Sequence, residues 1–437
     1  MKKVGATILV SSLLFTGLYG LAPKLEATAK ESNGEVKNVI FMIPDGYSAS
    51  YATNYRWYKG GETTMDSMLV GMMRTYSANT EVTDSAAAGT AMATGVKTNN
   101  GVISMTPDGK SLKTILESAE EKGKATGLVA TSTITHATPA VFASHVATRA
   151  SEGDIATQML DKDVDVLLGG GKNYFVPMDK GGKQKERDLI KEAQQEGYQF
   201  VEDKDGLQKA KGKKLLGLFA GEGMAPELDR ELTKEPGLAE MTEKAIDVLK
   251  QDKDGFFLMV EGSQIDWAGH AHDAAWAMKD TEAFEQVVNK AVQFAKKDKH
   301  TLVVIVGDHD TGGMSVGGYG QYDAKLEVLR NVTATGDFMA TKINTDRSNI
   351  KEVVKQYTQM DLTEAEVVKI KGASKVANAI NDVISERALV GWTSGAHTGT
   401  DLPLYVYGPN SELFSGLKNN TDLPILISQA MKLQLKN

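Results

Sequence analysis

Five short runs of apolar and β-branched residues limit most strongly how this chain can fold. They are "EVKNVIFMIPDG" at 35–46, "TGLVATS" at 126–132, "DVDVLLGGG" at 163–171, "GFFLMVEG" at 255–262 and "TLVVIVGDHD" at 301–310. Continuous runs of this kind, without polar alternation, are typical of strands that are buried on both faces, as in a parallel sheet.

Helical patterns separate several of these runs. They are "SLKTILESAEEKG" at 111–123, "LAEMTEKAIDVLKQDKDG" at 238–255 and "AFEQVVNKAVQFAKKDKH" at 283–300. Alternating strands and helices predict an α/β fold, a three-layer sandwich whose large, mostly parallel central sheet is flanked by helices. Residues 314–390 are polar, rich in lysine and irregular in pattern, and we interpret them as a small inserted, crown-like subdomain of one domain spanning 30–437.

The first 29 residues differ from the rest. Two lysines precede an apolar stretch, and Ala27-Thr28-Ala29 offers a small-x-small cleavage site, so we predict a signal peptide over 1–29 and an exported protein. The alternative is a retained membrane anchor, but Ser, Thr and Gly interrupt the apolar run. We expect no transmembrane span once the signal peptide is removed.

Charge and cysteine content narrow the possible partners. A net charge of -8 argues against a general nucleic-acid binder, which needs a basic face. The chain has no cysteine, so it forms no disulfide and any metal site must use oxygen and imidazole ligands.

Acidic and imidazole side chains gather where the predicted strands end. Those at or just past the strand ends are Asp45, Glu261, Asp308 and His309. In open α/β sheets the carboxyl edge is where ligands bind. Asp266 and His270 are four residues apart, so one helix face can present both to a cation, and His397 lies in a glycine-rich loop.

Carboxylates with imidazoles and no thiolate suit zinc in a catalytic site. Each pair alone has an ordinary explanation, as a surface pair or a turn, and the prediction rests on their joint placement. We interpret the other histidines, His145, His272 and His300, as structural or solvated.

The segment "VTDSAAAGTAMATGVKT" at 82–98 places Asp84 and Ser85 ahead of small apolar residues. One interpretation is an N-cap pair that opens an alanine-rich helix. The other is a serine nucleophile at a helix N-terminus, with small residues leaving space in front of it.

Together these motifs resemble the alkaline phosphatase family along essentially the whole mature chain, and bacillus-type bacterial members in particular. They are "PDG" at 44–46, "TDSAAAGTAMATGVKT" at 83–98, "HATPAVFASHVATR" at 136–149, "VEGSQIDWAGH" at 260–270, "GDHDTGG" at 307–313 and "AHTG" at 396–399.

The resemblance implies a role for each matching residue. Ser85 would be the nucleophile that becomes phosphorylated, and Arg149 would bind the substrate phosphate. Two Zn²⁺ and one Mg²⁺ per subunit would be held by three sets of ligands: Asp266, His270 and His397; Asp45, Asp308 and His309; and Asp45, Thr138 and Glu261. The residues expected to face the phosphate are Asp84, Ser85, Arg149, His136 and Trp267.

Two of these positions vary within the family. Some relatives have Asp and Lys where this chain has His136 and Trp267. We therefore expect His136 either to join the third ion or to pack against Trp267, which leaves the identity of that ion open.

The implied reaction is the hydrolysis of phosphate monoesters, over a broad substrate range, by two in-line displacements. Ser85 attacks from the side of the second zinc, and the alcohol departs on the side of the first. Family members are commonly homodimers, which we expect here.

Three other functions remain to be separated from this one. A phosphodiesterase or sulfatase on the same sheet has less use for the third set of ligands, or needs a modifiable residue in another context. A protein that only captures zinc or phosphate needs no nucleophile. A metal-independent serine hydrolase is disfavoured because "TDSAAAG" is not a G-x-S-x-G elbow.

Overall fold

A computed structural model describes residues 34–437, so the predicted signal peptide lies outside the described residues. Within this part of the chain, no helix combines the length and the apolar character needed to cross a membrane.

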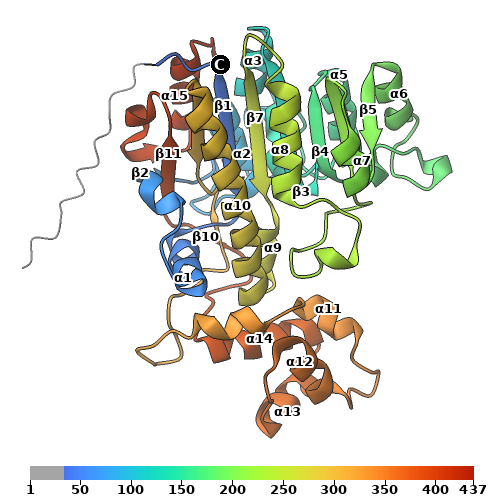
Figure 1. The fold of residues 1–437 in the computed structure, drawn as a ribbon, viewed down its shortest axis with the longest axis vertical. Coiled ribbons are helices and arrows are strands. Elements are labelled where there is room, and N and C mark those ends of the chain that lie inside the picture. Colours follow the sequence, from blue (N-terminus) through green and yellow to red (C-terminus); the bar gives the residue numbers. More distant parts are fainter. Residues whose placement is uncertain (1–33) are drawn as a thin grey trace, which may run out of the picture. The chain divides into compact units, whose positions relative to one another are not determined.

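A ten-stranded sheet forms the centre of the protein (Figure 1). Its order is β12-β2-β11-β8-β1-β7-β3-β4-β6-β5, and among these strands only β11 runs antiparallel to its neighbours. The strands are β1 Asn38–Pro44, β2 Leu69–Arg74, β3 Ala125–Thr133, β4 Val166–Gly170, β5 Tyr198–Val201, β6 Lys214–Leu218, β7 Phe256–Gly262, β8 Thr301–Ile305, β11 Leu402–Tyr407 and β12 Gly416–Asn419. The predicted mostly parallel sheet is confirmed.

Helices cover both faces of the sheet and make two hydrophobic cores. One core contains side chains of α1 Ala49–Lys59, α7 Lys204–Lys209, α8 Leu238–Leu249, α9 Gln264–His270 and α10 Ala274–Asp298. The other contains side chains of α2 Ser85–Thr94, α3 Ile115–Glu120, α4 Ala137–Ala143, α5 Glu152–Asp161, α6 Leu189–Gln195 and α15 Asp422–Met431.

The central strand β1 shows why its sequence is apolar throughout. Ile40 and Met42 point into the first core, whereas Val39 and Phe41 point into the second, where Phe41 meets Phe142 edge to face at 6.0 Å. Because successive side chains of a strand alternate between faces, a strand covered on both sides needs an unbroken apolar run.

The segment 314–390, irregular in its sequence pattern, contains four α-helices. It forms α11 Gly336–Thr341, α12 Ile350–Thr358, α13 Glu364–Gly372 and α14 Val376–Ala388, which gather beyond the end of the sheet near α9 (Figure 1). Each short helix buries a few apolar residues, such as Val354, Ile370 and Ile380, and exposes a polar face. In α12 the buried Ile350, Val353 and Val354 have the i, i+3, i+4 spacing of an amphipathic helix.

The three central strands end side by side. β1 pairs with both β7 and β8 in parallel, and Ile43 lies opposite Glu261. Their carboxyl ends therefore deliver Asp45, Glu261 and, through a short loop, Asp308 to one edge, as the sequence predicted.

Candidate functional site

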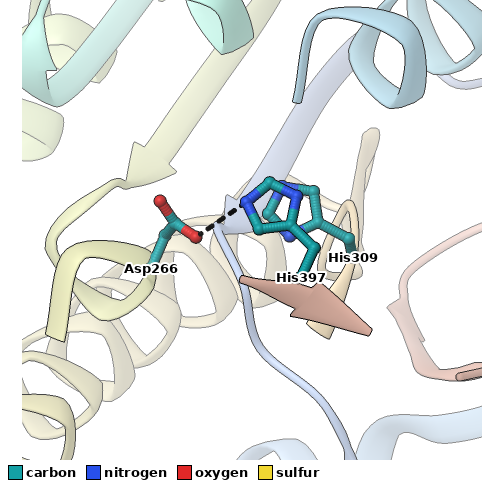
Figure 2. Close-up of side chains that lie close together, drawn as sticks. All are labelled: Asp266, His309 and His397. Atoms are coloured by element: carbon teal, nitrogen blue, oxygen red, sulfur yellow. Dashed lines mark ion pairs between the residues drawn. The ribbon is translucent and has the colours of Figure 1, made fainter. Parts of the chain in front are cut away.

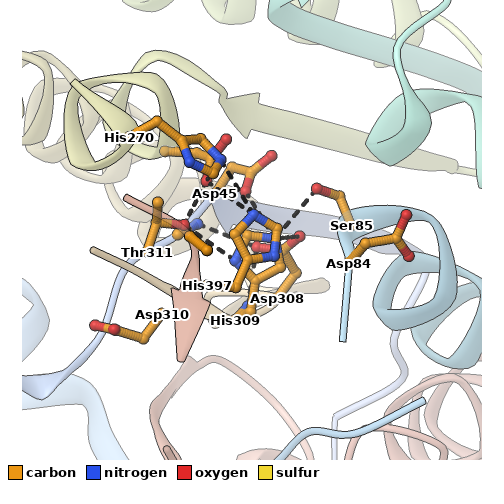
Figure 3. Close-up of polar contacts among 12 residues, drawn as sticks. Asp45, Asp84, Ser85, His270, Asp308, His309, Asp310, Thr311 and His397 are labelled. Atoms are coloured by element: carbon orange, nitrogen blue, oxygen red, sulfur yellow. Dashed lines mark hydrogen bonds and ion pairs between the residues drawn. The ribbon is translucent and has the colours of Figure 1, made fainter. Parts of the chain in front are cut away.

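Ser85 is the first residue of α2, and Asp84 is its N-cap. The Asp84 carboxylate accepts a hydrogen bond from the Ala87 N–H at 2.9 Å, so the capping interpretation holds. The Ser85 hydroxyl is almost fully buried, and its Oγ lies 3.1 Å from His309 Nε2 (Figure 3). Ser85 therefore stands both at a helix N-terminus, which favours anions, and against a candidate metal ligand.

The small residues of α2 also have a packing reason. All ten residues of this helix are buried. A Cβ on Gly89 would come within 2.8 Å of the Val141 side chain on α4. The alanines and the glycine thus let α2 pack closely against its neighbours in the core.

Three carboxylates meet at the ends of the central strands. Asp45, Glu261 and Asp308 are all inaccessible to solvent. Burial, together with the charges of Asp308, Asp266 and Glu261, raises the pKa of Asp45 well above its usual value, and burial raises the pKa of Glu261 to about 7. Burial also opposes ionisation of Asp308, but the adjacent His309 holds the pKa of its carboxyl below the ordinary value.

Each of the three carboxylates keeps an oxygen without a hydrogen-bond donor among the described residues: Asp45 Oδ1, Glu261 Oε1 and Asp308 Oδ2. Buried polar atoms are normally paired, so these orphaned oxygens need an explanation. Divalent cations fit, because they take carboxylate oxygens as ligands and offset the negative charge.

A second cluster combines Asp266 with His270, the last residue of α9, and His397 on the short strand β10. Asp266 Oδ1 lies 3.4 Å from His270 Nε2 and 3.6 Å from His397 Nε2. The His397 ring stacks on His309 with centroids 3.5 Å apart (Figure 2). Burial opposes ionisation of Asp266, but contact with His270 and the charge of His309 keep its pKa below the ordinary value.

A two-strand ladder brings His397 to this place. β9 Asp310–Thr311 pairs antiparallel with β10 His397–Thr398, and His397 lies opposite Thr311. The Nδ1 of His397 contacts the Thr83 carbonyl at 2.9 Å, which orients Nε2 toward Asp266. Such an outer hydrogen bond is the usual means of fixing a metal-binding imidazole.

Three groups of candidate ligand atoms can be compared with the three predicted sets; within each group the atoms lie within 4.8 Å of one another. Asp45, Asp308 and His309 form one group, which is the predicted second set. Asp266 and His397 group with His309, while His270 Nε2 stays 3.2 Å from His397 Nε2. Asp45 and Glu261 group with His136, and Thr138 donates to Asp45 Oδ2 at 3.3 Å.

Arg149 links the residues expected to face phosphate. Its Nη1 donates to Asp84 Oδ2 at 3.1 Å, and its Nη2 lies 2.8 Å from His136 Nε2. Burial and the Arg149 charge lower the pKa of His136 to about 3, so its imidazole is neutral. The His136 ring meets Trp267 edge to face at 6.1 Å.

The sequence analysis did not single out Thr311. Its Oγ1 donates to Asp266 and lies 3.2 Å from His309 Nδ1, so this hydroxyl joins two predicted metal ligands. A signal was present in "DHDTGG", because residues two apart on a short strand project from the same face.

The remaining histidines have partners away from the three groups. His145 contacts Glu117, His272 stacks on Trp392, and His300 contacts the Glu35 carbonyl. Within residues 34–437 none of them belongs to a candidate metal group, in agreement with their structural interpretation.

The site as a whole offers carboxylate and imidazole donors around a helix N-terminus. This donor chemistry fits zinc in a catalytic site, and the oxygen-rich end near Glu261 also fits magnesium. A serine hydroxyl and an arginine beside such cations can transfer and hold an anionic group.

Comparison with known proteins agrees with this chemistry. The family model described as alkaline phosphatase matches residues 36–433. Alkaline phosphatase 3 of Bacillus subtilis is 44% identical over 463 residues, which cover 100% of this chain and 98% of that protein.

Solved structures are similar as well. The alkaline phosphatase of Thermus thermophilus has a TM-score of 0.85 at 29% identity, covering 96% of both chains. A histidine-to-aspartate variant of the TAB5 alkaline phosphatase, with Mg bound in its M3 site, has a TM-score of 0.69 at 29% identity and covers 92% of this chain and 99% of its own.

Proposed function

The chain belongs to the alkaline phosphatase family of metal-dependent phosphoric monoester hydrolases, and we propose that Ser85 is the nucleophile with which it hydrolyses phosphate monoesters. The observation that carries this proposal is the position of Ser85 Oγ, 3.1 Å from His309 Nε2 at the start of α2. Ser85 would accept the phosphoryl group while the alcohol leaves, and water would then release inorganic phosphate.

We assign two Zn²⁺ and one Mg²⁺ to the three predicted ligand sets. The first zinc would be held by Asp266, His270 and His397, the second by Asp45, Asp308 and His309, and the magnesium by Asp45, Thr138 and Glu261. When bound, these cations would supply Lewis-acid activation of the hydroxyl and neutralise developing negative charge. The orphaned oxygens of Asp45, Glu261 and Asp308 support this assignment.

Arg149 would bind the phosphoryl oxygens, together with the N–H groups at the start of α2. Its guanidinium can donate two parallel hydrogen bonds to phosphate, which a lysine cannot reproduce. Asp84 holds it from one side and His136 from the other, at 3.1 and 2.8 Å. Because these groups grip the phosphoryl part, we expect a broad range of monoesters.

The third ion deserves its own test because His136 groups with Asp45 and Glu261. A TAB5 variant in which aspartate replaces a histidine holds Mg in its M3 site. An imidazole favours zinc over magnesium, so His136 would allow zinc at the third position. Anomalous scattering at the zinc edge tests this, and magnesium with His136 turned away would contradict it.

We also infer that two copies of the chain form a homodimer. β12 is the outer strand of the sheet, and exposed apolar side chains lie on it and nearby, including Leu417, Ile425 and Tyr76. A free sheet edge flanked by apolar side chains favours association. Light scattering on Leu417→Asp, compared with the unchanged chain, tests whether this edge is the interface.

The proposal also covers the amino-terminal segment and the extent of the catalytic domain. We propose that residues 1–29 are removed and that 30–437 form one catalytic domain with a crown-like insertion at 314–390. The protein recovered from the medium would then have the mass of a chain that begins at Lys30. An intact amino terminus on the exported protein would contradict the signal-peptide prediction.

The decisive experiment traps the covalent intermediate. Rapid acid quench during turnover, followed by peptide mass spectrometry, is expected to place phosphate on Ser85, and Ser85→Ala is expected to lose both phosphate and turnover. Chelation should abolish activity, with zinc and magnesium restoring it together. Turnover by Ser85→Ala at the normal rate would exclude the covalent mechanism, and preference for a bis-ester over an aryl monoester would indicate a diesterase.

A further inference from the structure

A cavity of about 620 Å³ lies between the end of α9 and the helical insertion. One wall comes from the α9–α10 region and the other from α11 and the start of α14. The lining residues are Trp267, His270, Ala271, Trp276, Asp337, Ala340, Lys375, Val376, Ala377 and Asn378. Ser85 and Arg149 do not line it, whereas Trp267 and His270 do, so the cavity adjoins the place where phosphate would bind.

The walls of this cavity are mostly apolar and remain accessible. Trp267, Ala340, Val376 and Ala377 are half-buried, and Trp276 is buried. The edge-to-face contact with His136 gives the Trp267 ring a defined orientation. The volume falls within the range of small-molecule sites, roughly 300–1,000 Å³.

His270, which lines the cavity, is separated from Ser85 by two other imidazoles. Ser85 Oγ contacts His309, the His309 ring stacks on His397 at 3.5 Å, and His397 Nε2 lies 3.2 Å from His270 Nε2. Figure 3 shows Ser85 on one side of the stacked His309 and His397 rings and His270 on the other. In an in-line displacement the leaving oxygen is opposite the attacking oxygen, so the alcohol would depart toward His270.

We infer that this cavity binds the alcohol part of the substrate, and that it favours flat apolar leaving groups such as aryl alcohols. The inference rests on the proposed function, because it takes Ser85 as the attacking group. Trp267 supplies an aromatic surface for stacking, while Ala340, Val376 and Ala377 supply the opposite wall from the insertion. The insertion thus determines specificity within a site that otherwise grips only the phosphoryl group.

The kinetic test compares 1-naphthyl phosphate with glycerol 2-phosphate. Ala340→Phe and Ala377→Phe fill the cavity from two different helices, and Val368→Phe is the matched control, on a side chain of α13 that is 70% exposed. We expect KM for 1-naphthyl phosphate to rise about tenfold in both cavity variants, in the range that contacts in an apolar pocket supply. KM for glycerol 2-phosphate and both kcat values should stay within about twofold in all three variants.

A binding measurement makes the inference independent of turnover. By calorimetry, 1-naphthylphosphonate should bind the metal-loaded enzyme about tenfold more tightly than methylphosphonate, and Ala340→Phe should remove the difference. Equal binding of the two phosphonates, or a naphthyl preference that survives both cavity variants, would overturn the inference. If the unchanged enzyme hydrolysed neither ester, the proposed function would fail, while the phosphonate comparison would still decide the cavity.

Discussion

The candidate site has two halves that are built differently. The carboxylate half, with Asp45, Glu261 and Asp308, sits directly on the ends of β1, β7 and β8 and is closed to solvent. The imidazole half, with His270 and His397, sits on a short helix end and a two-residue strand outside the central sheet, and the His270 side chain is 39% exposed. Regular strand pairing positions the first half, whereas the second depends on contacts made from elsewhere.

The insertion makes several of those contacts. Asn381 Nδ2 on α14 donates to the Ala271 carbonyl at 2.9 Å, and Ser385 Oγ donates to the His272 carbonyl at 3.0 Å. Both carbonyls directly follow His270 in the chain. Strand register alone can therefore fix the ligands at the sheet edge. A ligand at the end of a short helix, such as His270, depends on a neighbouring element that holds the backbone beside it.

The strongest test of this contrast removes one ligand from each half. Asp45→Asn should lower kcat/KM by at least about 10³-fold, because Asp45 lies in two candidate metal groups and its charge cannot be replaced by its neighbours. His270→Ala should lower it by about 10–100-fold at limiting zinc, and much of that loss should be recovered with excess zinc. Steady-state kinetics over a zinc titration measures both.

The control for Asp45→Asn checks that the variant still folds. Unfolding of the variant and of the unchanged protein is followed in chelator by near-ultraviolet circular dichroism. Removing a repelling carboxylate should leave the metal-free protein at least as stable as the unchanged protein. Equal losses of activity in the two variants, with equal recovery by zinc, would contradict the distinction between the halves.

The carboxylate half could be predicted because the ends of its strands can be recognised in the sequence. The apolar runs before Asp45, Glu261 and Asp308 mark buried strands, and parallel strands put their carboxyl ends at one edge. The strands that escaped prediction are short or mixed in pattern. β5 has only 4 residues, β2 is largely exposed at its start, and a proline lies within β11.

The imidazole half could be predicted only from the sequence motifs that contain His270 and His397. His397 is 88 residues from His309 in the chain, and no local pattern shows that β9 and β10 bring the two rings into contact. The sequence analysis placed a crown-like subdomain at 314–390 without assigning helices within it. The hydrogen bonds from Asn381 and Ser385 to the Ala271 and His272 carbonyls join residues more than 100 positions apart, so no local sequence pattern predicts them.

The junction of α9, α10 and α11 provides a pH-dependent test. Asp273 is buried and accepts hydrogen bonds from the N–H groups of Trp276 and Gly336, at 3.0 and 3.1 Å. Burial raises its pKa from 3.8 to about 6. The stability that this protonated acid contributes is complete below about pH 4 and is lost as pH rises through about 6.

Asp273→Asn removes that titration. Relative to the unchanged protein, the variant should gain about 3 kcal/mol of unfolding free energy between pH 4 and pH 7, since one pKa unit corresponds to about 1.4 kcal/mol. Urea unfolding in chelator at several pH values measures the difference, and the exposed Asp361→Asn is the matched control. A difference between variant and unchanged protein that is constant over this range would show that the Asp273 pKa is not raised in the folded state.

The smallest expected effect comes from the contact between α14 and the chain after His270. Asn381→Ala deletes the hydrogen bond to the Ala271 carbonyl without touching any candidate ligand. Because outer contacts of this kind are worth about 10–100-fold in metal affinity or activity, we expect about a tenfold rise in the zinc concentration needed for half-maximal activity. At saturating zinc, kcat should be nearly unchanged. Asn331→Ala, at an exposed position of the same insertion, should leave the zinc titration where it was. If Asn381→Ala instead lowered kcat at every zinc concentration, the insertion would act on the reacting groups themselves, and the two halves would not differ in how they are held.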